Sequence, residues 1–335
     1  MMASMNPADT ERVREAGHAA RGPLGVRARG LVKRFGAVTA VRGVDLSLPA
    51  RGVCGLLGPN GAGKTTTIRM IAGILDPDEG FLEVAGLDAR RAGAAVRARI
   101  GYLPESAPLS PELTVLEHMR FRAGLAGLRG AGARTAIDDC MRRCDVARFA
   151  HRCAGTLSKG MQQRVGLAAA ILGDPAVVIL DEPSVGLDPG QTLVFRTLVR
   201  ELGESRLVLF SSHLLSEVES VCSELAVIAG GRLVVHEPLE AFRARAAQGA
   251  SFVVETDGPP AGVAAHALSA GWWRSEFALA DDAARAETVR ALAAAGLRVR
   301  RAGAEVRSLE SVFVELVHDA ARRDEGAPRS AGGGA

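Results

Sequence analysis

The chain has 335 residues, of which 47% are hydrophobic and 24% are charged, and its formal net charge is +3. This length allows about two domains, and the hydrophobic content is sufficient for a buried core. No run approaches the roughly 18 consecutive apolar residues of a membrane-spanning helix, and the N-terminus lacks a secretory apolar segment, so we expect a cytosolic globular protein. The balanced charge gives no reason to expect a nucleic acid or an anionic lipid surface as a partner.

The two ends of the chain, residues 1–22 and 323–335, have little apolar periodicity and many small or charged residues, which predicts disordered tails. Between the tails, strand-like apolar runs alternate with helical segments. The runs are Gly52 to Leu57, Ala176 to Leu180, Arg206 to Phe210 and Leu225 to Ile228. This alternation is typical of a largely parallel sheet covered by helices, so we predict an α/β domain over residues 23–238.

Helix signals replace this alternation between about residues 106 and 159. Thr114 and Glu117 have the spacing of a capping box before an apolar helical stretch, so we predict a helical subdomain inserted into the α/β domain. A further cycle of elements predicts a small α+β accessory domain over residues 239–322. Its expected elements are strands Ser251 to Glu255, Trp272 to Ala278 and Leu297 to Arg301, and helices Ala261 to Ser269, from Asp282 and from Ser308.

Two residue pairs admit both a binding and a packing interpretation. Cys140 and Cys144 are four residues apart and could hold a metal on one helix face, but they continue an apolar helical stripe, which favours core packing. The chain has five cysteines without a CxxC pair or a signal segment, so we expect reduced thiols. Trp272 and Trp273 could stack on a ligand, but alternate strand residues usually face core and surface in turn, which favours packing.

The most specific pattern is the stretch Gly-Pro-Asn-Gly-Ala-Gly-Lys-Thr-Thr from Gly58 to Thr66, which lies between an apolar run and a helical stretch. It satisfies the P-loop pattern G-x-x-x-x-G-K-[ST] in the order strand, loop, helix. In such a loop, backbone N–H groups and the positive end of the helix face phosphate oxygens. We predict ATP binding by Asn60, Gly61, Ala62, Gly63, Lys64, Thr65 and Thr66. Lys64 would neutralise the β and γ phosphates, and Thr65 would ligate Mg²⁺.

A second pattern is the apolar run Ala176 to Leu180, which ends in two adjacent carboxylates, Asp181 and Glu182. If this run is a buried parallel strand, the pair lies at the carboxyl edge where such sheets bind ligands. One carboxylate can hold the hydration shell of Mg²⁺, and the next can polarise a water for in-line attack on the γ-phosphate. We therefore predict Asp181 as a metal residue and Glu182 as the general base of a P-loop ATPase.

A third pattern, Leu157-Ser158-Lys159-Gly160-Met161, narrows the class. Here the chain resembles the ATPases of ABC transporters, whose signature Leu-Ser-Gly-Gly-Gln it matches at Leu157, Ser158 and Gly160 and departs from at Lys159 and Met161. The resemblance covers about Gly30 to Val235. It includes Pro183 to Pro189, similar to the D-loop of the family, Ser211-Ser212-His213, similar to its switch histidine, and Phe35, where the family places an adenine-stacking aromatic.

The resemblance implies an ATPase that works as a homodimer or heterodimer beneath separate integral-membrane permease subunits, at the cytoplasmic face of the inner membrane and without nucleic acid. It implies that Ser158, Gly160 and Asp188 complete the ATP site of the partner subunit. It also implies that His213 contacts the γ-phosphate, so that the catalytic set is Glu182, His213 and Lys64. Closure of the dimer on ATP and its release by hydrolysis would drive transport. The alternatives are that Phe35 is a buried strand aromatic and that His213 is a capping residue.

A finer resemblance rests on Tyr102-Leu103-Pro104-Glu105, on Leu157 to Met161 and on Ser308 to Phe313, which look like the ATPases of ABC-2-type exporters, close to the gliding-motility branch. Glu105 stands where most of the family has the glutamine of the Q-loop. As a carboxylate it is a third candidate metal residue beside Thr65 and Asp181. The alternative is that Glu105 is a solvated hinge residue that touches only the membrane subunit.

Other classes explain the sequence less well. ABC ATPases that act on ribosomes resemble two tandem cassettes, and those of DNA repair carry a long coiled coil, whereas this chain has one cassette with a short helical insertion. A P-loop kinase would leave the pattern at residues 157–164 without an explanation. The exported substrate and the role of residues 239–322 stay open, because neither is encoded in these patterns.

Overall fold

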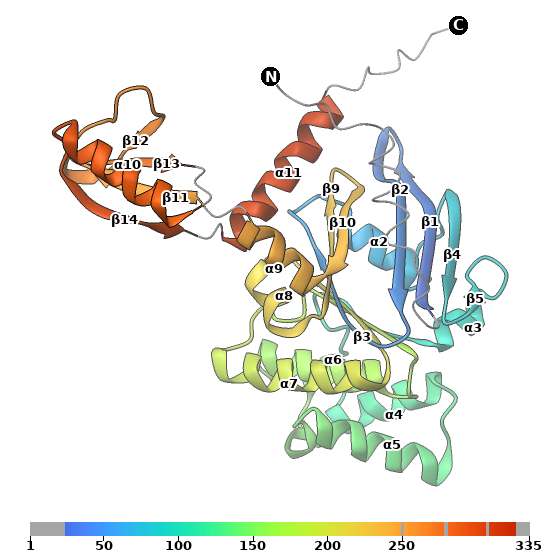
Figure 1. The fold of residues 1–335 in the computed structure, drawn as a ribbon. Coiled ribbons are helices and arrows are strands. Elements are labelled where there is room, and N and C mark those ends of the chain that lie inside the picture. The colour runs from blue at the N-terminus through green and yellow to red at the C-terminus, as the bar shows by residue number, and fades with distance from the viewer. Residues whose placement is uncertain (1–23, 249–250, 278–280, 306–307, 326–335) are drawn as a thin grey trace, which may run out of the picture. The chain divides into compact units, whose positions relative to one another are not determined.

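The computed structural model describes residues 24–248, 251–277, 281–305 and 308–325 (Figure 1). The predicted tail at residues 1–22 lies outside the described residues. The second predicted tail begins at residue 323, whereas helix α11 (Leu309–Glu325) continues to Glu325, and residues 326–335 lie outside the described part. Contacts divide the chain into two units, residues 1–239 with 317–335 and residues 240–316. In the described part of both units, no helix is long and apolar enough to cross a bilayer.

A six-stranded sheet in the order β10-β9-β3-β8-β7-β6 forms the centre of the first unit. All neighbouring strands are parallel except β10, which pairs antiparallel with β9. The strands are β3 (Gly52–Leu57), β6 (Ile100–Leu103), β7 (Val177–Asp181), β8 (Leu207–Ser212), β9 (Glu224–Ala229) and β10 (Arg232–Pro238). The apolar runs predicted from the sequence coincide with β3, β7, β8 and β9. The predicted α/β class is therefore confirmed.

A second, antiparallel sheet was not predicted. Its order is β2-β1-β4-β5, and its strands are β1 (Leu24–Phe35), β2 (Val38–Pro49), β4 (Glu79–Val84) and β5 (Leu87–Asp88). The main core cluster joins residues of both sheets and of helix α2, among them Leu46, Leu56 and Ile68. The hydrophobic effect thus fixes α2, and with it the loop before α2, between the two sheets.

Helices cover the six-stranded sheet and form the inserted segment. They are α2 (Lys64–Ile71), α3 (Gly93–Ala98), α4 (Val115–Leu125), α5 (Gly130–Arg143), α6 (Lys159–Ile171), α7 (Pro189–Ser205) and α8 (Leu215–Val221), with short 3-10 turns at Ala147–Phe149 and Ala154–Thr156. The predicted capping box is confirmed. The Glu117 amide donates to Thr114 Oγ1 at 3.2 Å, and the Thr114 amide donates to Glu117 Oε2 at 2.9 Å. Cys140 and Cys144 are buried in the core, as expected.

The second unit contains an antiparallel sheet in the order β12-β13-β11-β14. The elements of this unit are α9 (Leu239–Gln248), β11 (Ser251–Thr256), β12 (Ala265–Ala267), a 3-10 turn (Ser269–Gly271), β13 (Trp273–Phe277), α10 (Asp282–Ala294) and β14 (Val299–Glu305). Phe252, Val254 and Leu292 form its small core. The Arg300 guanidinium lies 4.6 Å from the centroid of the Trp272 ring, and both tryptophans are half-buried.

The prediction of a helix over residues 261–269 is wrong. This segment contains β12, in which Ala265 pairs with Ser275 and Ala267 with Trp273. The alanine-rich segment has a high helix propensity, but pairing with β13 outweighs it, because propensity is a weak preference that tertiary context overrides. Gly262, at φ +74°, adopts a left-handed conformation just before this strand and favours a turn there.

Candidate active site

The predicted chemical groups come together at one edge of the six-stranded sheet. The strands β3, β8, β7 and β6 are parallel neighbours, so their carboxyl ends meet at this edge. The edge carries the loop Gly58–Gly63 after β3, His213 after β8, Asp181 and Glu182 at the end of β7, and Glu105 just beyond β6. Doubly wound sheets bind ligands at this edge.

The loop between β3 and α2 has the backbone shape of a phosphate cradle. Gly63 caps α2 with φ +102°, a conformation that L side chains rarely adopt, and a Cβ at this position would lie 2.7 Å from the Ala40 carbonyl oxygen. The Gly231 amide donates to the Ala62 carbonyl at 2.9 Å, which anchors the loop to the neighbouring β9–β10 turn. These residues fit a bound nucleotide phosphate, because the turn leaves the first N–H groups of α2 without intrahelical partners.

Lys64 has a buried side chain that folds back along this loop. Its Nζ donates to the Gly58 carbonyl at 2.7 Å and to the Pro59 carbonyl at 3.3 Å, and lies 3.6 Å from Glu182 Oε1. The ammonium group is thus held inside the turn by neutral acceptors and one carboxylate. A phosphate in the cradle would offer stronger, charged acceptors to the same group.

Asp181 is a buried acid at the end of β7. Its Oδ1 accepts a hydrogen bond from Ser211 Oγ at 2.7 Å. Burial raises the pKa of Asp181, and the negative charges of Glu182 and Glu105 add to this rise, whereas the Ser211 hydroxyl and Arg69 oppose it. A divalent cation would reverse the balance, and the oxygen donors Asp181, Glu105 and Thr65 are the type that Mg²⁺ prefers.

Glu182 has an unusual backbone conformation, with φ +49°. Non-glycine residues rarely occupy this left-handed region, and such outliers concentrate at functional sites. Its amide donates to Ser211 Oγ at 2.9 Å, which helps to hold the conformation. Its Oε2 lies 2.8 Å from His213 Nδ1, so the carboxylate sits between an imidazole and the ammonium of Lys64.

Two polar residues of this edge were missed by the sequence analysis. The Ser211 hydroxyl donates to the Asp181 carboxylate and accepts from the Glu182 amide. Glu217 of α8 accepts hydrogen bonds from Ser184 Oγ and Ser212 Oγ, each at 2.6 Å. Glu217 therefore joins the segment after Glu182 to the segment before His213. The serines precede a predicted functional histidine, which was an available signal, but nothing in the sequence indicates which acids they meet.

Ser158, Gly160 and Asp188 lie at two helix starts. Ser158 caps α6 by accepting from the Met161 amide at 3.3 Å, and Asp188 caps α7 by accepting from the Gln191 amide at 2.8 Å. Gly160 packs directly against Gln191, whose Oε1 would overlap a Cβ at this position. In the described residues, no hydrogen bond or ion pair joins Ser158 or Asp188 to the loop Gly58–Thr66 of the same chain. Both side chains are exposed.

Phe35 and Glu105 flank the edge. Phe35, at the end of β1, is 49% exposed, so it is not a buried strand aromatic, and Lys33 Nζ lies 5.9 Å from its ring centroid. Glu105 is exposed, and its carbonyl accepts a hydrogen bond from the buried Gln163 side chain at 2.7 Å.

The comparisons with known proteins agree with this geometry. The family model described as "ABC transporter" matches residues 41–185. The ABC transporter ATP-binding protein NatA of Bacillus subtilis is 37% identical over 207 residues, which cover 61% of this chain and 84% of NatA. The daunorubicin resistance ATP-binding protein DrrA3 of Streptomyces coeruleorubidus is 36% identical over 216 residues, 64% of this chain and 68% of DrrA3. The probable multidrug ABC transporter ATP-binding protein YbhF of Escherichia coli is 39% identical over 208 residues, 61% of this chain but 36% of YbhF.

Solved structures give the same result for the fold. An ATP-binding subunit of an ABC transporter superposes with a TM-score of 0.61 at 29% identity, covering 66% of this chain and 92% of that structure. A dimeric bacterial ABC transporter cassette superposes with a TM-score of 0.59 at 23% identity, covering 64% of this chain and 98% of the cassette. The second likeness supports the fold alone.

Proposed function

This chain belongs to the ATP-binding proteins of ABC transporters, and we propose that it is the ATP-hydrolysing subunit of an exporter whose membrane-spanning subunits are separate chains. The observation that carries the proposal is the meeting of Lys64, Glu182 and His213 beside the phosphate cradle at one sheet edge. A cradle alone would support nucleotide binding. A carboxylate held between an imidazole and an ammonium group adds the means for hydrolysis.

In the proposed mechanism, Glu182 accepts the proton of the attacking water. His213 holds the carboxylate through the 2.8 Å bond to Nδ1, and the 3.6 Å ion pair with Lys64 is exchanged for contacts to the β and γ phosphates. Mg²⁺, when bound, would supply charge neutralisation at the phosphates. Thr65, Asp181 and Glu105 are the residues that would hold it.

The proposed second half of each ATP site comes from a partner cassette. Ser158, Gly160 and Asp188 are candidates because Ser158 and Asp188 are exposed and engaged only in helix capping among the described contacts. The contact of Gly160 with Gln191 joins the two helix starts, so they can meet a partner's nucleotide together. A surface that is completed only by nucleotide makes closure depend on ATP and makes opening depend on hydrolysis. Phe35 would stack on the adenine of the same chain's ATP.

Export is the direction of transport that the relatives favour. The names of DrrA3 and YbhF refer to drug resistance and multidrug transport. We place this chain among the ATPases of ABC-2-type exporters, close to the gliding-motility branch, on the residues Tyr102 to Glu105, Leu157 to Met161 and Ser308 to Phe313. The protein would then act at the cytoplasmic face of the inner membrane, in a homodimer or heterodimer, and without nucleic acid. Co-purification with a polytopic membrane protein tests this placement.

The shared site is tested with Ser158→Arg. The long cationic side chain would collide with the partner's phosphate, so we expect steady-state hydrolysis to fall by about 100-fold or more, while binding of a fluorescent ATP analogue to the monomer stays near the wild-type level. A mixture of Ser158→Arg with Lys64→Ala contains one intact composite site per mixed dimer, so activity should partly return. A mixture with no recovered activity would contradict independently competent shared sites.

Two control variants separate this effect from helix capping. Ser158→Asp keeps the cap but places a negative charge against the γ-phosphate, so it should also be inactive, whereas a purely structural role would leave it active. Thr197→Arg adds the same side chain at an exposed position of α7 and should hydrolyse ATP at the wild-type rate.

A further inference from the structure

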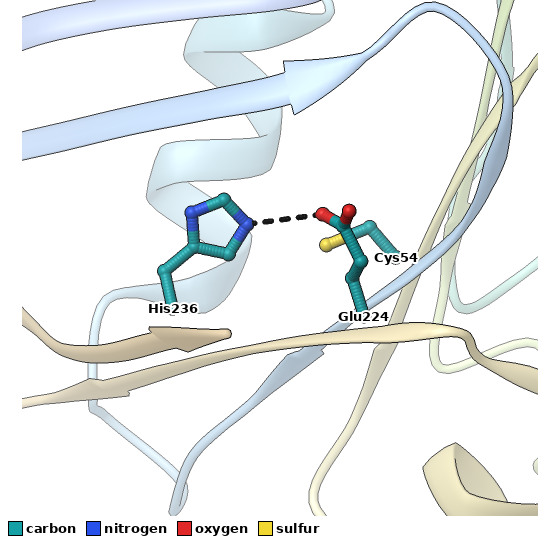
Figure 2. A group of neighbouring side chains, drawn as sticks. All are labelled: Cys54, Glu224 and His236. Carbon is teal, nitrogen blue, oxygen red and sulfur yellow. Dashed lines mark hydrogen bonds and ion pairs between the residues drawn. The ribbon is translucent and has the colours of Figure 1, made fainter. Parts of the chain in front are cut away.

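A cysteine, a glutamate and a histidine form a cluster across three adjacent strands of the six-stranded sheet. Cys54 of β3 lies opposite Glu224 of β9 in the parallel register, and His236 of β10 is the diagonal neighbour of Glu224, because Glu224 pairs with Pro238 and His236 pairs with Ala226. One ligand atom of each side chain lies within 4.8 Å of the other two. Figure 2 shows the imidazole, the carboxylate and the sulfur directed toward one another.

The cluster is separate from the nucleotide edge. Glu224 is the first residue of β9, and Cys54 lies near the start of β3, which begins at Gly52. Both positions therefore belong to the amino end of the parallel strands, whereas the P-loop follows their carboxyl end. The proposed ATPase mechanism uses none of these three side chains.

The donor atoms of the three groups suit a bound cation, which would replace the thiol proton of the buried Cys54 side chain. The Glu224 carboxylate lies 3.3 Å from His236 Nε2, and the side chains of His236 and Glu224 are 22% and 14% exposed. A cation would stabilise the thiolate and the carboxylate at once, and it could enter past the two partly exposed side chains.

We propose that Cys54 Sγ, the Glu224 carboxylate and His236 Nε2 form a zinc site, with water as the fourth ligand. Sulfur, imidazole nitrogen and carboxylate oxygen are the three donor types that Zn²⁺ accepts in a tetrahedral site. Tetrahedral geometry at the usual bond lengths places ligand atoms roughly 3.5 Å apart. Side-chain rotations that move the ligand atoms by about 1 Å would therefore close the observed cluster around the ion. The zinc would tie β10, the single antiparallel strand of this sheet, to β9 and β3.

The decisive measurement is zinc binding by the metal-stripped, nucleotide-free full chain in competition with a chelating dye. We expect one Zn²⁺ per chain, and at least about tenfold weaker binding in Cys54→Ser and in His236→Gln. Cys222→Ser is the matched control. The Cys222 thiol would contact a Cβ added at Gly55, and Gly55 faces the side of β3 opposite to Cys54, so zinc binding should persist in this variant. Asp181→Asn should also retain it, which separates this site from the nucleotide edge.

Cobalt provides a second readout that a structural role of the cluster would not produce. Co²⁺ bound by a thiolate gives a charge-transfer absorption in the near ultraviolet, which we expect in the wild-type chain and in Cys222→Ser but not in Cys54→Ser. His236→Gln changes a partly exposed residue, and its circular dichroism spectrum checks that the fold is kept. Absence of zinc binding in the wild type, or equal binding in the Cys54 and His236 variants, would overturn the proposal and leave an ordinary ion pair beside a buried thiol.

Discussion

Two buried carboxylates, one in each unit, lie in opposite electrostatic settings. Glu255 of β11 is held by two arginines of the neighbouring strand β14, with Arg300 Nε 2.6 Å from Oε2 and Arg301 Nη1 3.8 Å from Oε1. Asp181 of β7 accepts a hydrogen bond from a serine hydroxyl, and the acids Glu182 and Glu105 lie close enough to raise its pKa. Glu255 thus forms ion pairs with arginines of its own unit, whereas the charges of neighbouring acids act on Asp181.

This difference separates a structural acid from a functional one. A buried carboxylate with its own guanidinium partners needs no ligand, and removal of a partner leaves an uncompensated charge. A buried carboxylate among other acids destabilises the fold through electrostatic repulsion, and a bound cation relieves this repulsion. Substitutions at the two sites should therefore change stability in opposite directions, and only those at the β7 edge should change catalysis.

The largest expected effect is on hydrolysis, in Glu182→Gln. An amide cannot accept the proton of the attacking water, so we expect the steady-state rate of phosphate release to fall by about 100-fold or more, with ATP binding retained. ATP should then accumulate in a closed dimer, which size-exclusion chromatography in Mg·ATP would detect. Glu201→Gln, an exposed acid on α7, is the matched control and should keep the wild-type rate. Hydrolysis at the wild-type rate by Glu182→Gln would show that another group is the base.

The next effect is on the stability of the second unit, in Arg300→Ala. This variant leaves Glu255 buried with the more distant Arg301, so we expect a loss of about 1–3 kcal/mol in the free energy of unfolding. The only two tryptophans of the chain, Trp272 and Trp273, lie in this unit, so tryptophan fluorescence during urea unfolding reports on it specifically. ATP hydrolysis by the full chain, assayed without membrane subunits, should not change.

Two further variants test the cause of that loss. Adding Glu255→Gln to Arg300→Ala removes the unpaired charge and should recover part of the stability. Arg298→Ala breaks an ion pair with Asp257 whose arginine side chain is 82% exposed, so it should cost less than Arg300→Ala. Equal losses in Arg298→Ala and Arg300→Ala would mean that burial of Glu255 is not the reason.

The third expected effect is a gain in the free energy of unfolding, in Asp181→Asn, in contrast to the loss in Arg300→Ala. Burial raises the folded-state pKa of Asp181 above its ordinary value of 3.8, so the native state favours the protonated acid. The stability that the protonated Asp181 contributes is lost as the pH rises through the folded-state pKa. Without metal and nucleotide at pH 7, the neutral amide should therefore raise the free energy of unfolding by about 0.5–1 kcal/mol, while hydrolysis is lost. The gain should disappear in urea titrations below pH 3.8. A loss of stability at pH 7 would contradict this account of the edge.

The same contrast between the units limits what the sequence can predict. The strand Gly52–Leu57 was predicted at its observed bounds, because a buried parallel strand is a continuous apolar run followed by a glycine-rich loop. In the second unit, alanine-rich residues 261–269 pointed to a helix, and the pairing of β12 with β13 decided otherwise. The pairing joins Ala265 to Ser275 and Ala267 to Trp273, and the preference of a residue for a strand depends on such cross-strand neighbours, which the periodicity of the segment itself does not encode.

The candidate site shows a similar division. Lys64, Asp181, Glu182 and His213 could be selected from patterns because each follows a strand or lies in a spaced motif. The hydroxyl of Ser211, which donates to the Asp181 carboxylate and accepts from the Glu182 amide, could not be assigned without the register of β7 and β8. The left-handed backbone of Glu182 is likewise a product of its surroundings, since glutamate has no preference for it. The cluster of Cys54, Glu224 and His236 spans three strands and leaves no spacing pattern.

The smallest expected effect concerns Glu105, whose charge contributes to the raised pKa of Asp181. A carboxylate binds Mg²⁺ more strongly than an amide, and its repulsion of the other acids is relieved only when the metal is bound. Glu105→Gln should therefore preserve substantial hydrolysis but raise the Mg²⁺ concentration for half-maximal rate by about twofold to fivefold, with a larger rise in Glu105→Ala.

Glu112→Gln, which changes an exposed acid of the following loop, should leave the Mg²⁺ titration unchanged. The Glu105 carbonyl that accepts from Gln163 is kept in all Glu105 variants, so the loop anchor is not altered. If the Mg²⁺ titration of the isolated protein is unchanged in both Glu105 variants and only transport in the assembled complex falls, Glu105 is a hinge residue that meets the membrane subunit and the carboxyl edge binds its metal without it.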